Sequence, residues 1–139
     1  MSPQQTQFSN RLRAAFEASQ LEDGMNHPAE RIIRKALRSP KNRQVLDWLK
    51  SFSLDEEHPD FAASVLRCLG RQTKPGTCSW RIELIRRALT TDDVEIRDAA
   101  VQAAESWDEE ESANILKSHH EPEPWLREYI LDVISDLGK

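Results

Sequence analysis

The sequence predicts an all-α fold, a right-handed α-solenoid of about four stacked helical hairpins with eight helices. The first observation is a recurring helix start, in which an apolar residue follows a polar one: His27-Pro28, His58-Pro59, Asp93-Val94 and Glu123-Pro124. Successive starts are 31, 35 and 30 residues apart, and periods of this length are typical of stacked helical hairpins. The second observation is that only four of the 139 residues are glycine. So few glycines disfavour both an all-β fold with many tight turns and a glycine-rich phosphate loop.

The first two hairpins are expected at residues 6–39 and 41–71. In the first, an apolar stripe that begins at Phe8 predicts one helix, a turn follows at residues 23–26, and Pro28 starts the partner helix. In the second, a helix at about residues 42–52 precedes one that starts at Pro59 and ends at Gly70. A loop at residues 72–77 accounts for the longest offset.

The last two hairpins are expected at residues 77–107 and 109–138. Their apolar positions recur at helical spacing, and the second helix of the third hairpin is rich in alanine: Ala99, Ala100, Ala103 and Ala104. Small side chains let neighbouring helices approach at the short end of the usual distance of about 8–10 Å. A single hairpin cannot bury its apolar face alone, so the four are expected to form one domain, residues 1–139.

The third hairpin resembles a HEAT repeat. An apolar first helix ends at Leu84-Ile85-x-x-Ala88-Leu89, and an acidic turn then leads into Val94-Glu95-Ile96-Arg97 and the alanine-rich segment. In HEAT repeats a turn aspartate and a helix arginine commonly bond between neighbouring hairpins, which implies these roles for Asp92 or Asp93 and for Arg97. The equivalent positions in the other hairpins hold Arg31, Ala62 and Arg127. The match is good over residues 82–107 and elsewhere concerns architecture.

Positive and negative charge are segregated along the chain. Residues 31–43 hold six basic residues and no acidic one, whereas residues 92–139 hold fourteen acidic and four basic residues, a net charge of −10. The whole chain has a net charge of −5. Such polarity steers charged partners. The basic strip consists of Arg31, Arg34, Lys35, Arg38, Lys41 and Arg43, which Arg67 and Arg71 extend.

No pattern of side chains indicates catalysis, and we expect no enzyme activity, no cofactor and no metal. His119-His120-Glu121 with Glu123 gathers residue types that bind metals, but no further ligand follows at a recognisable spacing, so a solvated turn is favoured. The run Asp108–Glu111 is interpreted as a solvated helix start capped by Ser106 or Asp108.

The two cysteines and the four tryptophans have structural interpretations. Cys68 lies on an apolar helix face and is expected to be buried, whereas Cys78 opens a helix, where the dipole lowers the pKa of a thiol. Two unpaired cysteines fit a cytoplasmic location, and no apolar run reaches the ~20 residues of a membrane span. Core positions are expected for Trp48 and Trp107. Trp80 and Trp125 lie in the first turns of their helices, and structural packing is favoured for both over the alternative, partial exposure as an anchor for a partner.

We therefore predict a non-enzymatic protein–protein interaction module: an adaptor, an assembly factor or an inhibitor of the immunity-protein type. Its partner is expected on the surface formed by successive second helices. The expected contact residues are Arg34, Arg38, Arg67, Arg71, Arg97, Glu128 and Asp132.

The alternative is nucleic-acid binding through residues 31–43, as in the HEAT-like alkylpurine DNA glycosylases. The acidic net charge weighs against it, because affinity for nucleic acid rests largely on phosphate neutralisation. A third reading, an enzyme subunit with a ligand pocket, lacks a convergent set of polar residues in the sequence.

Overall fold

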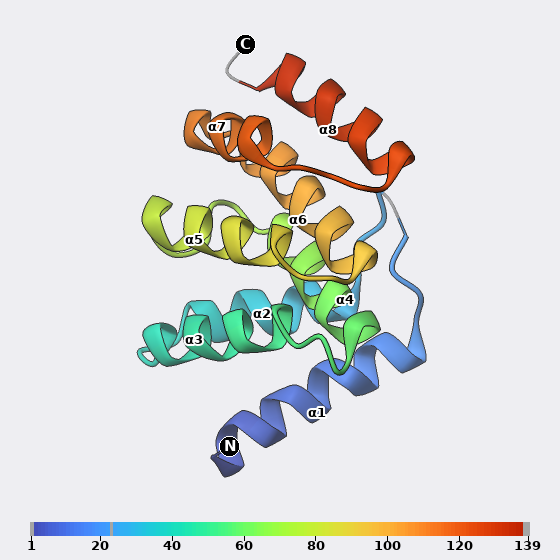
Figure 1. Cartoon of the computed structure of the whole chain (residues 1–139). Coiled ribbons are helices and arrows are strands. Elements are labelled where there is room, and N and C mark those ends of the chain that lie inside the picture. Colours follow the sequence, from blue (N-terminus) through green and yellow to red (C-terminus); the bar gives the residue numbers. More distant parts are fainter. Residues whose placement is uncertain (1, 23, 138–139) are drawn as a thin grey trace.

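The computed structural model describes residues 2–22 and 24–137, and this part of the chain is all-helical (Figure 1). Asp23, in the expected first turn, and Gly138, in the last expected hairpin, lie outside the described residues. The helices are α1 (Pro3–Ala18), α2 (Pro28–Leu37), α3 (Asn42–Ser53), α4 (Pro59–Gly70), α5 (Cys78–Leu89), α6 (Val94–Trp107), α7 (Glu110–Ser118) and α8 (Pro124–Asp136). The all-helical prediction is confirmed for the described residues, and each helix falls within its expected segment except at the N-terminus.

Local capping explains where the helices begin. The expected start at residue 6 is wrong, because the Ser2 hydroxyl accepts a hydrogen bond from the Gln5 N–H and Pro3 occupies the first helical position. Asp93 caps α6 by accepting from the N–H groups of Glu95 and Ile96. Of the four recurring starts, those at His27 and Asp93 have a side-chain cap, whereas His58 and Glu123 make no such hydrogen bond.

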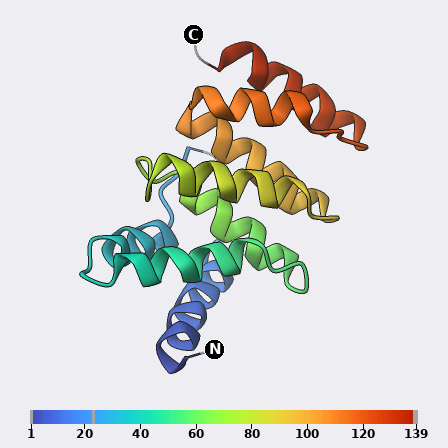
Figure 2. The same ribbon diagram turned by 60° about the vertical axis from the view of Figure 1, so that its left-hand side comes forward.

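The helices pack as pairs in successive layers. Three pairs lie side by side, α3 with α4, α5 with α6 and α7 with α8, and α4, α6 and α8 follow one another along the molecule (Figures 1 and 2). The closest approach joins α4 to α6: a Cβ atom added to Gly70 would lie 3.0 Å from the Cα atom of Ala103. The small residues thus allow the close helix contact that the sequence predicted.

The first pair has a different arrangement. α1 packs against α4 as well as α2, and α2 packs against both α3 and α4. An aromatic cluster fixes α1, with the ring of Phe8 6.0 Å from that of Trp48 and the ring of Phe16 6.1 Å from that of Phe61. Because α2 packs against both α3 and α4, the end of α2 lies close to the start of α3 and the end of α4.

The core agrees with the apolar pattern. Trp107 is buried, Trp48 and Trp80 are partly buried, and Trp125 is 48% exposed. Cys68 is fully buried, and burial together with the nearby Glu30 carboxylate raises its pKa to about 12. The expectation of a buried, inert thiol is confirmed. No described helix is both long enough and apolar enough to cross a bilayer.

Candidate functional site

A basic cavity of about 690 Å³ opens where α2 ends, α3 begins and the chain leaves α4. Among the described residues, four arginines line it and no acidic residue does. The lining residues are Arg34, Leu37, Arg38, Asn42, Arg43, Leu46, Arg71, Gln72, Thr73, Pro75, Gly76 and Thr77. We call this site the basic cavity. Concentrated positive charge in a recess attracts anions, because the protein walls screen the field less than water does.

Three of the four arginines have no protein partner. The side chains of Arg34, Arg38 and Arg43 are exposed, and no hydrogen bond or ion pair joins their guanidinium groups to another described residue. Arg34 and Arg38 are also one helical turn apart on α2, where like charges repel. These three cations are therefore available to a ligand.

The start of α3 adds a further positive element. Lys41 occupies the N-cap position without a side-chain hydrogen bond, and the first turn of α3 contains no acidic residue. By contrast, side chains of Ser2, His27 and Thr77 cap α1, α2 and α5. The first N–H groups of α3 thus retain their capacity to donate to an anion.

Arg71, the fourth arginine, is held in place. Its guanidinium donates to the carbonyl oxygens of Glu22 at 2.8 Å and Met25 at 2.9 Å, and it lies 3.2 Å from the Glu30 carboxylate. Glu30 is buried and also accepts from the His27 N–H. This network joins the segment before α2 to the end of α4, so it fixes one wall of the basic cavity.

The loop at residues 72–77 forms another part of the wall. The Nη1 group of Arg81 donates to three carbonyl oxygens of this loop, those of Lys74, Pro75 and Gly76, at 2.9–3.0 Å. Gly76 has φ +66°, and a Cβ atom there would lie 3.3 Å from both Leu46 and Trp80. The turn therefore requires glycine, and its carbonyl groups face Arg81.

Arg67, another expected contact residue, is engaged on α6. Its guanidinium donates to Glu95 at 3.0 Å, to Asp98 at 3.1 Å and to Gln102 at 3.2 Å. It lines a separate hollow of about 470 Å³ that also includes Arg71. Arg67 thus helps to hold α4 on α6 and does not line the basic cavity.

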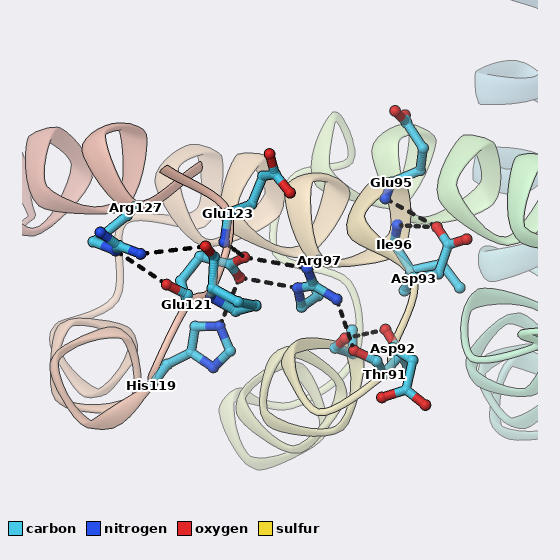
Figure 3. Close-up of polar contacts among 12 residues, drawn as sticks. Thr91, Asp92, Asp93, Glu95, Ile96, Arg97, His119, Glu121, Glu123 and Arg127 are labelled. Atoms are coloured by element: carbon cyan, nitrogen blue, oxygen red, sulfur yellow. Dashed lines mark hydrogen bonds and ion pairs between the residues drawn. The ribbon is translucent and has the colours of Figure 1, made fainter. Parts of the chain in front are cut away.

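Arg97 does not lie on the surface, contrary to its expected place among the contact residues. It is 7% exposed and binds the Glu121 carboxylate with two hydrogen bonds, of 2.9 Å and 3.1 Å (Figure 3). Glu121 is itself 3% exposed, so the expected solvated turn at residues 119–121 is wrong at this position. His119 and the Glu123 N–H also donate to this carboxylate.

The same network sets the ionisation of Glu121. Burial by itself raises the pKa of this carboxyl, but the hydrogen bonds from Arg97, His119 and Glu123 together lower the pKa below its ordinary value. The buried carboxyl is thus ionised at neutral pH, which keeps it bound to Arg97.

The turn acid of the third hairpin has another role than the HEAT resemblance implied. Asp93 caps its own helix, and the acid that binds Arg97 is Glu121, which precedes α8. Arg127 repeats part of the pattern: it donates to the Glu121 carbonyl, six residues earlier, as Arg97 does to that of Thr91 (Figure 3). Arg97 and Arg127 therefore occupy equivalent positions in the last two hairpins, because each binds a backbone carbonyl of the turn before its own helix.

A second buried ion pair joins α5 to the start of α7. The Arg81 guanidinium donates to the Glu109 carboxylate, and both side chains are buried. The helix start expected at this run is present, and Asp108, Glu110 and Glu111 are exposed, but Glu109 is buried. The expected cap at Ser106 or Asp108 is wrong, because Glu109 is the N-cap residue and Asp108 ends α6 with φ +48°.

Cys78 borders this ion pair. Its thiol donates to Glu109 at 2.9 Å, and this hydrogen bond, above all, raises the pKa of Cys78 rather than lowering it as expected. One oxygen each of Glu109 and Glu111 and the Cys78 sulfur lie within 4.8 Å of one another, close enough to share an ion. Arg81 already neutralises Glu109, so we interpret the group as part of the ion pair.

The acidic members of the expected contact surface lie apart from the arginines. Glu128 and Asp132 are exposed on α8, beside the exposed side chains of Trp125 and Leu131. Of the seven expected contact residues, the structure brings together Arg34, Arg38 and Arg71.

Comparison of the chain with protein-family models, curated proteins and solved structures gave no significant match.

The lining residues Arg43, Asn42 and Thr77 were not among the expected contact residues. Arg43 lay within the basic strip, and Gly76 within a recognised loop. The sequence signal that could have indicated these lining residues is that each of their segments follows the end of a second helix: the start of α3 follows α2, and the loop 72–77 follows α4. That juxtaposition depends on how α2 packs on α3 and α4.

Proposed function

We propose that this chain is a HEAT-like helical-repeat protein that binds a partner protein and catalyses no reaction. In this proposal, an acidic segment of the partner enters the basic cavity. The observation that carries the proposal is the lining of the cavity, in which the structure places four arginines and, among the described residues, no acidic one. An adaptor, an assembly factor or an inhibitor would each work in this way.

Two features support the solenoid part of the proposal. α3/α4, α5/α6 and α7/α8 form consecutive pairs, and the buried pair of Arg97 with Glu121 joins the third hairpin to the fourth. Stacked repeats of this kind bury their apolar faces against one another and leave an extended surface for a partner.

A protein partner fits the charge better than a nucleic acid does. The four arginines of the cavity lie together in one recess between α2, α3 and the loop after α4, and residues 92–139 carry a net charge of −10. Duplex DNA presents phosphates along an extended surface, so such an acidic half disfavours it.

The test is affinity capture from the native lysate with two matched charge reversals. The cavity variant is Arg34→Glu with Arg38→Glu, and the control is Arg31→Glu with Lys35→Glu. Arg31 and Lys35 are exposed on the same helix but do not line the cavity, so the two variants change the net charge equally.

At a physiological ionic strength of about 0.15 M, we expect a protein captured by the parent chain to be lost with the cavity variant. The control should retain it. Equal capture by both variants, or equal loss, would overturn the proposal. Capture that nuclease treatment abolishes would replace it with the nucleic-acid alternative.

A further inference from the structure

We propose that the basic cavity is a binding site for a phosphate monoester. This inference rests on the proposed function for the source of the ligand, a phosphorylated side chain in the partner's acidic segment. Its basis is geometric: a single recess is lined by four guanidinium groups. Among the described residues, three of these groups have no partner, the fourth is anchored, and no carboxylate lines the recess.

The number of donors favours a phosphate monoester over a carboxylate. Each guanidinium carries five N–H donors in a planar fork that matches two oxygens of an anion. A carboxylate has two oxygens and one charge, whereas a phosphate monoester has three terminal oxygens and a charge of about −1.5 to −2 at pH 7. Arg34, Arg38 and Arg43 come from two different helices, so together they suit a ligand that accepts from several directions.

The cavity walls are organised for an anion. Three carbonyl oxygens of the loop 72–77 would repel one, but Arg81 already binds them. The loop contributes the hydroxyl groups of Thr73 and Thr77 to the lining, and the first turn of α3 contributes Asn42. Hydroxyl and amide groups donate readily to phosphate oxygens.

The fixed wall makes the site preformed. Glu30 and two carbonyl groups hold Arg71, and the Gln72 side chain donates to the Glu30 carbonyl at 3.0 Å. The Gln72 carbonyl in turn accepts from Trp107 on α6. A ligand therefore needs to order mainly Arg34, Arg38 and Arg43, which keeps the entropic cost of binding low.

The test uses the full-length ¹⁵N-labelled chain and small probes at constant ionic strength. The probes are blocked phosphoserine, blocked aspartate and dimethyl phosphate, each followed by amide NMR shifts. Dimethyl phosphate represents the phosphodiester of a nucleic acid. The variants are Arg34→Gln with Arg38→Gln, and Arg31→Gln with Lys35→Gln as the matched control.

We expect blocked phosphoserine to cause saturable shifts confined to the segments that line the cavity, residues 34–38, 42–46 and 71–77. Blocked aspartate and dimethyl phosphate should bind at least tenfold more weakly. The cavity variant should lose at least tenfold in affinity for phosphoserine, and the control should stay within twofold of the parent. A cavity variant that binds as the parent does, or dimethyl phosphate that binds as tightly as phosphoserine, would overturn the inference.

Two further probes separate the sources of the monoester. If an acidic phosphoserine peptide binds more tightly than glycerol 3-phosphate, the ligand is a protein. If glycerol 3-phosphate binds more tightly, the phosphate site is supported but its ligand is a small metabolite.

Failure of the inference is distinct from failure of the proposed function. Partner capture that depends on Arg34 and Arg38 without phosphoserine binding overturns only the phosphate site, whereas phosphoserine binding without a captured protein overturns only the protein partner.

Discussion

The junction of the last two hairpins and the basic cavity use the same side chain in opposite ways. At the junction, Arg81 and Arg97 are buried and each is bound to a glutamate from the following hairpin. At the cavity, Arg34, Arg38 and Arg43 are exposed and have no acidic partner among the described residues. This difference indicates that the role of an arginine here depends on whether an acidic side chain of the same chain forms an ion pair with it. Paired arginines join the hairpins, and unpaired ones are free to bind a ligand.

The largest expected effect tests the paired half of this comparison. Glu121→Ala leaves the Arg97 guanidinium buried without its counter-ion, and we expect the free energy of unfolding to fall by about 3–5 kcal/mol. Urea denaturation measures it. Glu128→Ala is the control, because this exposed carboxylate should change stability by no more than about 0.5 kcal/mol. A loss below about 1 kcal/mol for Glu121→Ala would contradict a stabilising role for the buried pair.

A second, smaller effect is the pH dependence of the same pair. The pKa of Glu121 is lowered in the folded chain, so the unfolded chain takes up this proton at a higher pH than the folded one does. The stabilisation is therefore complete above the ordinary glutamate pKa of about 4.3 and is lost as the pH falls through the lower folded value.

Glu121→Gln removes this titration. We expect the stability difference between the parent and Glu121→Gln to shrink as the pH is lowered below about 4.3, measured by urea denaturation at each pH. A difference that is constant or grows as the pH falls would contradict the assignment.

The smallest expected effect tests the unpaired half. Arg34→Gln removes a like-charge repulsion with Arg38 one turn away, but it also removes a cation from the last turn of α2, where positive charge interacts favourably with the helix dipole. The two effects oppose each other, so stability at low salt should change by no more than about 0.5 kcal/mol, and added salt should reduce the change. Denaturation at low and high chloride concentration measures it, and a loss of more than about 1 kcal/mol at low salt would show that Arg34 has a structural role.

The helices could be predicted from the sequence because their signals are local. Prolines at the first helical position, caps such as Asp93 and apolar stripes all act within one or two turns. The alanine-rich face of α6 likewise predicted its close contact with α4, which Gly70 and Ala103 make. Each of these signals depends only on neighbours in the sequence.

The site could be predicted only in part, because it depends on partners far apart in the sequence. Arg97 has the polarity of a surface residue, and its burial follows from Glu121, 24 residues later. Equally, nothing near Arg34 indicates that Arg43 and the loop 72–77 share its cavity. The sequence shows the positive charge of the strip at residues 31–43. It does not show which of the six basic residues line the same cavity.

The measurement that tests the central claim most directly is urea denaturation of the parent and of Arg34→Gln with Arg38→Gln, in chloride and in phosphate of equal ionic strength. The account predicts that the variant lies within about 1 kcal/mol of the parent in chloride. Phosphate stabilises folded proteins in general, so the account predicts that it stabilises the parent more than the variant, by a difference that grows with phosphate concentration. A variant much less stable than the parent in chloride, or an equal stabilisation of both chains by phosphate, would contradict the claim that the unpaired arginines serve a ligand.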